Sequence, residues 1–325
     1  MKKKFKKALG PLAFVLVFVL ILTGLSVFFV PKYATDFDSA TQSEKRSQTI
    51  YYEEKNTVDF LAIGDSETYT SISPMEIFHS YGFTGFVSAV PSIRMQQIYY
   101  NLEDIYAVQK PQVVLLECNA VFRKTGGRLK QLQLTAEGLL QRAFPVFKNH
   151  NNWKNMLTDW LQGQQVSGDA DPLKGFDYRC SVKPYKGGEY MHKTDKTANI
   201  LQTNLFYLDK IRNLCAEQGS QLILYNAPSP KNSTYEKHNA IQRYADKYGL
   251  TYVDFNLLTD ELQIDWEKDT MDGGDHLNMD GALKVTAYMG QYLAENTQLL
   301  DRRGDTKYNS WSDLYTEYLK QTKQA

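Results

Sequence analysis

From Val58 onward, short apolar segments alternate with segments of helical periodicity, and this alternation constrains the fold more than any other feature of the sequence. The apolar segments are rich in Val, Ile, Leu and aromatic residues and end in turn-forming residues; they cover residues 58–63, 83–90, 112–117, 221–226 and 251–255. Apolar residues recur at helical spacing in residues 73–82, 94–110, 204–219, 235–249 and 279–296. We therefore predict an α/β fold, a three-layer sandwich in which helices cover both faces of a mostly parallel five-stranded sheet.

The predicted domain covers residues 57–300, and one long segment interrupts its rhythm. Residues 121–198 are rich in Lys, Gln, Asn, Gly and Trp, so we interpret them as an insertion that covers or shapes the functional site. Residues 31–56 are polar without sustained periodicity and are predicted to form a stalk, with TIYYEE within them as an alternative edge strand. The tail, residues 301–325, is predicted to add a short helix that packs on the domain.

The N-terminal region contains an uncharged stretch, residues 8–30, that is long enough to cross a bilayer, which takes roughly 20 apolar residues. A cleavable signal peptide is the alternative, but its apolar region spans about 7–15 residues and ends near small residues. This stretch is longer and is followed by FFVPKY, so we expect an uncleaved, single-pass anchor in the cell membrane. Lysines crowd residues 1–7, which predicts a cytoplasmic N-terminal tip and an extracellular domain.

The charge of the chain argues against a nucleic-acid partner. The formal net charge is zero, and removing the five N-terminal lysines leaves 32 basic residues against 37 acidic ones. A protein that binds nucleic acid needs a basic surface, which this balance does not provide. The three cysteines show neither the C-x-x-C spacing of metal sites nor a disulfide framework, and we expect neither a metal nor a cofactor.

A serine follows the first predicted strand directly, in the sequence Gly64-Asp65-Ser66-Glu67. In parallel α/β sheets, reactive groups gather at the carboxyl ends of the strands, which is where Ser66 is expected. A serine hydroxyl becomes a good nucleophile only when a base removes its proton. Taken alone, this segment is equally consistent with an ordinary strand followed by a polar turn.

One histidine has the setting that such a serine requires. His276 lies in an acidic, glycine-rich loop just before the last predicted helix of the domain, beside Asp272 and Asp275. A neighbouring carboxylate holds an imidazole in one tautomer and stabilises its charged form. The alternative is a solvated acidic loop whose histidine caps the helix. Asn119, after the third strand, is a candidate donor to an oxyanion, or else a residue that closes a turn.

Together these segments resemble the SGNH (GDSL-type) hydrolase family. That family has a Gly-Asp-Ser block after its first strand, an asparagine after the third and an Asp-x-x-His block before the last helix. The resemblance implies that Ser66 is the nucleophile, that His276 is the base, and that the Ser66 N–H and Asn119 hold the oxyanion.

The sequence departs from the family pattern at two places, which concern the second oxyanion donor and the acid that orients the histidine. The glycine of the second block is missing from FVSAVPSIRM, so Ser92 or a neighbouring N–H is the candidate oxyanion donor there. Three residues before His276 stands Gly273 instead of an acid. Asp272, with one extra glycine in the loop, is therefore favoured over the adjacent Asp275 as the third member of the triad.

Three segments carry a closer resemblance: APSPKNSTYEKHNAIQRYADKYGLTYVDFN (227–256), DGGDHLNMDGALKVT (272–286) and FKNHNNWKN (147–155). They resemble a membrane-anchored Gram-positive branch of the family, related to DltD and to exopolysaccharide O-acetylation factors. This resemblance implies an extracytoplasmic O-acyltransferase or esterase that carries acetyl or D-alanyl groups of a cell-surface glycopolymer on Ser66. It also implies a membrane-bound O-acyltransferase as partner. The alternative is a non-catalytic assembly or binding factor with the same fold.

Other polar residues are candidates for substrate binding. Asp65 and Glu67 flank the serine, and the loop after the fourth strand carries Lys231, Asn232 and His238. In the insertion, His150 and Trp153 are candidates for a sugar-binding groove, with a small structural core as the alternative.

Overall fold

The computed structural model describes residues 2–28, 42–124, 126–149 and 170–323. The chain divides into two compact units, which we describe separately. One comprises Met1–Ser39 and Thr125–Ser167, and the other comprises Ala40–Lys124 and Gly168–Ala325. The predicted insertion 121–198 is therefore not one piece, because residues 170–198 belong to the same unit as the sheet.

A five-stranded parallel sheet forms the centre of the second unit. Its strands are β1 (Phe60–Gly64), β2 (Gly85–Ala89), β3 (Val113–Glu117), β4 (Gln221–Asn226) and β5 (Thr251–Asp254), in the order β2-β1-β3-β4-β5. Phe60 pairs with Gly85 on one side and with Val113 on the other, so the carboxyl ends of the strands share one edge. This sheet confirms the predicted fold class and all five predicted strands.

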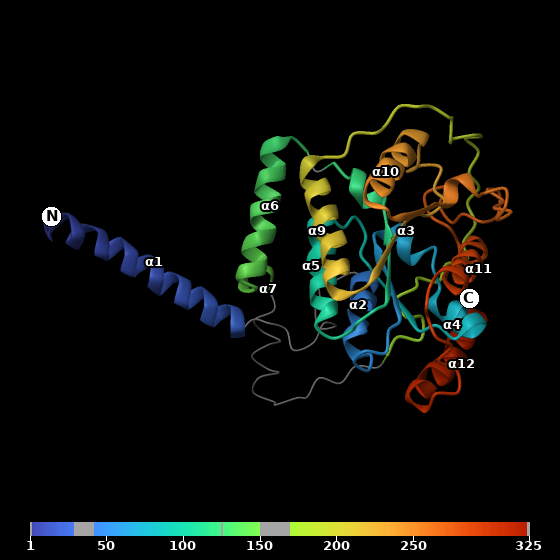
Figure 1. Cartoon of the computed structure of the whole chain (residues 1–325), viewed down its shortest axis with the longest axis horizontal. Helices are drawn as coiled ribbons and strands as arrows, with labels where there is room; N and C mark the ends of the chain where they lie inside the picture. The colour runs from blue at the N-terminus through green and yellow to red at the C-terminus, as the bar shows by residue number, and fades with distance from the viewer. Residues whose placement is uncertain (1, 29–41, 125, 150–169, 324–325) are drawn as a thin grey trace. The chain divides into compact units, whose positions relative to one another are not determined.

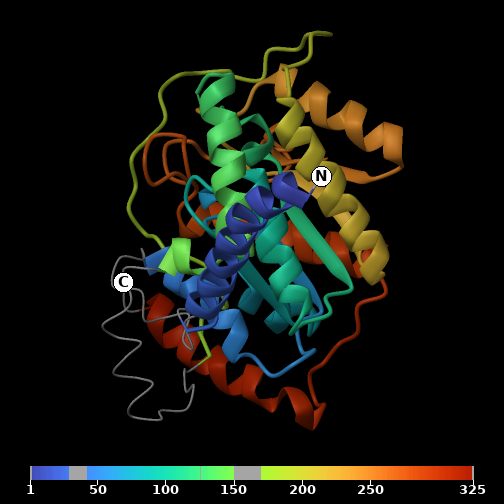
Figure 2. The same cartoon turned by 90° about the vertical axis from the view of Figure 1, so that its left-hand side faces the viewer.

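Helices cover both faces of the sheet. On one face lie α5 (Met95–Tyr106), α9 (Gln202–Gln218) and α10 (Tyr235–Tyr248), with α5 and α9 side by side (Figures 1 and 2). On the other face lie α4 (Pro74–Tyr81) and α11 (Met279–Asn296). Side chains alternate along β1, so Leu61 and Ile63 pack toward the first group while Phe60 and Ala62 pack toward the second. Burial on both faces explains why the strands are almost wholly apolar.

The C-terminal tail packs on the domain as predicted. Helix α12 (Asn309–Lys323) follows the short helix η5 (Thr306–Tyr308). Its Trp311 and Tyr318 are buried in one cluster with Phe78 of α4 and Phe176. The tail helix therefore belongs to the packed core of this unit.

Part of the predicted stalk is also packed on the domain. Residues 42–52 form α2 (Gln42–Gln48) and the 3-10 helix η1 (Thr49–Tyr52), so TIYYEE is not an edge strand. Ile50 is fully buried, and Glu53 accepts hydrogen bonds at 2.7 Å from the buried Lys174 to both carboxylate oxygens. The stalk prediction is wrong for this part, because a buried apolar side chain and a buried ion pair hold it in place. Residues 31–41 of the predicted stalk lie outside the described residues.

The first unit contains the long helix α1 (Lys2–Phe28), the helix α6 (Arg128–Ala143) and the short helix α7 (Val146–Asn149). Within α1, Gly10–Val27 has a mean hydropathy of 2.4 and only 6% of it is buried, so it is long and apolar enough to cross a membrane. Membrane anchors and signal sequences share this property.

Candidate active site

Ser66 lies where β1 gives way to a short helix. The helix α3 (Ser66–Tyr69) begins with the serine, and the preceding Asp65 caps it by accepting a hydrogen bond from the Glu67 N–H at 3.1 Å. Gly64 lets this turn approach β3 closely, because a Cβ on residue 64 would lie 2.9 Å from Glu117 Cβ and 2.4 Å from Thr68 Oγ1. The serine is therefore held at the carboxyl end of β1, as the sequence predicts.

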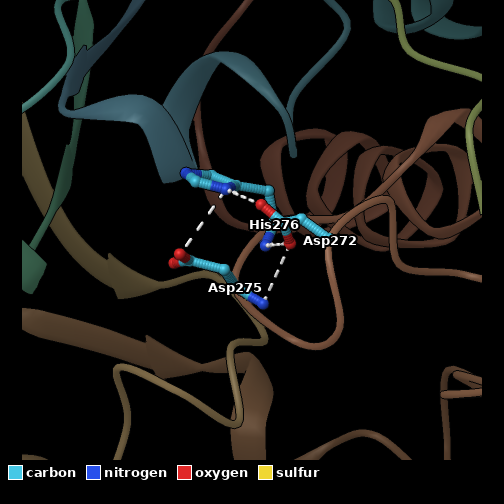
Figure 3. Close-up of side chains that lie close together, drawn as sticks. All are labelled: Asp272, Asp275 and His276. Atoms are coloured by element: carbon cyan, nitrogen blue, oxygen red, sulfur yellow. Dashed lines mark hydrogen bonds and ion pairs between the residues drawn. The ribbon is translucent and has the colours of Figure 1, made fainter. Parts of the chain in front are cut away.

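His276 joins the serine to a carboxylate. Its Nε2 lies 2.8 Å from Ser66 Oγ. On the other side of the ring, its Nδ1 lies 2.6 Å from Asp272 Oδ2, as Figure 3 shows. An ionised carboxylate only accepts hydrogen bonds, so Nδ1 carries the proton and Nε2 is left to accept the hydrogen bond of the serine hydroxyl. This is the arrangement that a nucleophile, its base and an orienting acid require.

Of the two acidic neighbours, the geometry favours Asp272. Asp275 Oδ1 lies 3.9 Å from His276 Nδ1, which is too far for a hydrogen bond. Asp272 Oδ1 also accepts hydrogen bonds from the backbone N–H groups of Asp275 (3.1 Å) and His276 (2.8 Å). Gly273 and Gly274 have φ angles of 82° and 91°, left-handed values that favour glycine, and they turn the chain back so that one carboxylate serves all three donors.

The pKa of Asp272 is consistent with an ionised orienting group. Burial raises the pKa of this half-exposed carboxyl, but hydrogen bonds from the ring and backbone of His276 outweigh that effect. The net result is a pKa below the ordinary aspartate value. Asp272 therefore remains an anion at neutral pH.

The loop after β4 is hydrogen-bonded to the loop that carries His276, residues 269–278 (the histidine loop). Lys231 Nζ donates to the Asp272 carbonyl oxygen at 2.7 Å, and Ser229 Oγ donates to the Asp275 carbonyl oxygen at 2.8 Å. Asn232 Nδ2 donates to Asp275 Oδ1 at 2.5 Å and to Glu67 Oε1 at 2.6 Å. Lys231 and Asn232 thus contact the histidine loop. The substrate-binding role predicted for both stays a prediction.

His238 belongs to a neighbouring cluster. Its Nδ1 lies 2.9 Å from Asp254 Oδ2, and its ring packs on those of Tyr235 and Tyr252. The Tyr252 hydroxyl lies within hydrogen-bond distance of Asp254 Oδ2 (3.0 Å) and of Asn226 Oδ1 (2.7 Å). The structure therefore connects His238 to the ends of β4 and β5, and a substrate contact stays a prediction.

A buried group of three carboxylates lies beneath the serine, formed by Asp65, Glu67 and Glu117, with an oxygen of each within 4.8 Å of the others. Asp65 Oδ2 accepts hydrogen bonds from Arg123 (2.7 Å) and Asn119 (3.1 Å), and Glu117 Oε1 accepts one from Asn226 (3.1 Å). Sequence reasoning missed Glu117 and Arg123 as members of this site. The position of Glu117 as an acidic residue at the end of a buried strand could have indicated its place in the site.

The group of three carboxylates is better suited to hold a shared proton than to bind a metal ion. Glu67 Oε2 is buried without a hydrogen-bond partner among the described residues, whereas Arg123 already supplies a cation to Asp65. Burial, followed by the charges of Glu117 and Asp65, raises the pKa of Glu67 well above its ordinary value. Burial and the charge of Asp65 do the same to the pKa of Glu117. A proton held between these groups would satisfy the unpaired oxygen.

The predicted oxyanion donors differ in their surroundings. Asn119 begins the 3-10 helix η2 (Asn119–Phe122), and its side-chain amide donates a hydrogen bond to Asp65 Oδ2, next to Ser66 in the chain. An amide nitrogen has two hydrogens, so one remains for an oxyanion. Ser92 is exposed after β2 with a φ of 57°, a left-handed angle typical of the glycine that the family pattern has in this region. Both roles stay predictions. His150 and Trp153 lie outside the described residues.

Comparisons with known proteins show only weak likenesses to solved structures. No family model matches the chain, and no curated protein matches it. Among solved structures, a proposed acylhydrolase from Bacteroides fragilis is 11% identical, with a TM-score of 0.40 and coverage of 80% of this chain and 99% of that one. A GDSL-like lipase from Bacteroides thetaiotaomicron is 10% identical, with a TM-score of 0.40 and coverage of 78% and 98%. A proposed lipolytic protein of the G-D-S-L family from Desulfitobacterium hafniense is 12% identical, with a TM-score of 0.39 and coverage of 72% and 98%. Likenesses this weak carry no argument for function.

Proposed function

We propose that this chain is a serine esterase or O-acyltransferase of the SGNH type, anchored in the cell membrane by α1 and working outside the cytoplasm. The observation that carries the proposal is the unbroken hydrogen-bonded series Ser66–His276–Asp272, with contacts of 2.8 and 2.6 Å. These three side chains come from two segments far apart in the chain, and each has the partner that acyl-transfer chemistry requires.

In the first half of the reaction, Ser66 Oγ attacks the acyl carbonyl carbon while His276 Nε2 takes its proton. Asp272 stabilises the resulting imidazolium through Nδ1. The backbone N–H of Ser66 and the Asn119 side chain hold the negative oxygen of the tetrahedral intermediate. His276 then gives its proton to the leaving oxygen as that bond breaks, which leaves the acyl group on Ser66.

In the second half, His276 activates an incoming hydroxyl, which attacks the acyl-serine and regenerates Ser66. Water gives hydrolysis, and a sugar or polyol hydroxyl gives transfer. We propose a cell-surface glycopolymer as the substrate, acetyl or D-alanyl as the acyl group, and a membrane-bound O-acyltransferase as the partner. The support for this finer proposal is the resemblance of the sequence and the apolar length of α1.

Labelling with a fluorophosphonate probe tests the nucleophile, because only an activated serine reacts with it. We expect the wild-type protein and a Ser80→Ala variant to be labelled, since Ser80 is an exposed serine on α4. We expect Ser66→Ala to remain unlabelled. Absence of labelling in the wild-type protein would favour the non-catalytic assembly factor instead.

A further inference from the structure

Helix α6 carries its apolar side chains on the outside. Leu129, Leu132, Leu139 and Leu140 are 83%, 55%, 52% and 51% exposed, and none of the residues of α6 is buried. At about 100° of rotation per residue, these four leucines fall on one face roughly 100° wide. A helix in a water-soluble protein turns such a face toward a core, so this face requires an apolar occupant.

The next helix connects this face to the apolar span. Within the first unit, α7 packs against α1, and the Val146 N–H donates to Ser26 Oγ at 3.4 Å. Both residues are buried, in contrast to most of α1. Ser26 lies near the end of the span Gly10–Val27, about 11 Å along the helix axis from its midpoint. Half of a bilayer hydrocarbon core is about 15 Å thick, so this contact places α7 close to the level where hydrocarbon meets headgroups.

The charges of α6 suit the same location. Arg128, Lys130 and Arg142 outnumber the single acidic residue of the helix, Glu137, and Arg128 and Arg142 border the leucine face on one side. Long basic side chains at such positions reach the headgroups while their stems lie along the apolar boundary. A net positive helix is also attracted to anionic lipids.

We infer that α6 and α7 lie along the membrane surface, with the leucine face of α6 in the boundary between acyl chains and headgroups. The occupant of the face is the lipid bilayer in which α1 is anchored, so the inference rests on the proposed anchor. It goes beyond a single spanning helix, because the chain then contacts the membrane at two places. Phe147, 42% exposed on α7, extends the apolar surface toward the end of α1.

Collision measurements on nitroxide labels test this inference in the full-length protein, in nanodiscs of phosphatidylcholine and phosphatidylglycerol. Cysteine is introduced in a Cys180→Ser background, since Cys180 is exposed whereas Cys118 and Cys215 are buried. The test positions are Leu132→Cys and Leu139→Cys, and the matched controls on the polar side are Lys130→Cys and Glu137→Cys. Val17→Cys, within the span, reports on the anchor itself.

We expect labels at 132 and 139 to collide several-fold more with lipid-soluble oxygen, relative to a water-soluble nickel complex, than labels at 130 and 137. Equal access of the nickel complex to both faces would overturn the inference. Protection of positions 132 and 139 from both reagents would also overturn it, because it would show that protein covers the face. If the label at Val17→Cys is not accessible to oxygen, α1 is not a membrane anchor and the inference fails with it. If the label at 17 is accessible to oxygen but the label at 132 is accessible to the nickel complex, the anchor stands and only the placement of α6 on the membrane surface is overturned.

Discussion

His276 Nε2 lies 2.8 Å from Ser66 Oγ, although 210 residues separate the two in the chain. The sheet makes this possible, because β1 presents the serine at its carboxyl end and the loop before α11 returns to the same edge. Asp272 completes the series from the histidine loop itself. The functional predictions follow from treating these three side chains as one unit.

Removal of the serine and of the histidine should not be additive. We expect Ser66→Ala and His276→Ala each to lower kcat/KM for p-nitrophenyl acetate by roughly 10³- to 10⁶-fold, and the double variant to be little worse than either. Steady-state hydrolysis rates of the three variants provide the measurement. Losses that multiply in the double variant would show that the two residues act separately.

The two candidate acids should respond differently to removal of charge. Asp272→Asn removes the carboxylate that accepts the His276 Nδ1 hydrogen bond, so we expect kcat to fall by roughly 10²- to 10⁴-fold. Asp275→Asn is the matched control, because Asp275 lies 3.9 Å from the ring; we expect less than about a tenfold loss. An effect of Asp275→Asn as large as that of Asp272→Asn would sink the assignment of Asp272.

The raised pKa of Glu67 predicts how stability depends on pH. A carboxyl whose pKa is higher in the folded state binds its proton more tightly there, and this binding stabilises the fold. The stabilisation is complete at pH values below the pKa of the unfolded state, and it is lost as the pH rises through the pKa of the folded state. Glu67→Gln keeps an oxygen for the Asn232 donor without a titrating proton. We therefore expect the wild-type urea midpoint to fall more steeply than that of Glu67→Gln as pH rises above the ordinary glutamate range.

Urea unfolding in mild detergent at a series of pH values, followed by tryptophan fluorescence, measures this difference. Glu217→Gln, at an exposed position of α9, is the control and should follow the wild-type profile. Parallel profiles for wild type and Glu67→Gln would contradict the retained proton.

Gly64→Ala should disturb the turn that presents the serine. The added Cβ would lie 2.9 Å from Glu117 Cβ, so we expect a loss of about 1–3 kcal/mol in unfolding free energy together with reduced esterase activity. Gly127→Ala is the control, because a Cβ there meets nothing within 4 Å and its φ is −69°. Urea unfolding and p-nitrophenyl acetate hydrolysis give the two readouts, and unchanged values for Gly64→Ala would refute the close approach.

The strands and most helices could be predicted from the sequence because their patterns are local. Runs such as Phe60–Gly64 are apolar throughout because both faces of a parallel sheet are covered, and that composition is visible without the fold. Ser66 and His276 could also be selected, since each directly follows or precedes a predictable element. The sequence favours Asp272 by allowing one extra glycine in the histidine loop, and the structure shows the turn that brings the Asp272 carboxylate to the His276 ring.

Contacts between distant segments were decided only by the tertiary structure. No local pattern shows that Glu53 pairs with Lys174, so the sequence predicts a stalk over residues 31–56 although residues 42–53 pack on the domain. The same holds for Arg123 and Glu117, whose carboxylate neighbours Asp65 and Glu67 lie at the start of α3, far from them in the chain.

The sequence by itself therefore determined the α/β class, the apolar N-terminal helix and the choice of Ser66 and His276 as candidate nucleophile and base. Only the tertiary structure shows that Asp272, and not Asp275, lies within hydrogen-bond distance of the His276 ring, and which charges are buried near Ser66. The physical reason is that periodicity records which face of an element is buried, whereas a hydrogen bond or ion pair depends on the exact atoms that another element brings within about 3 Å.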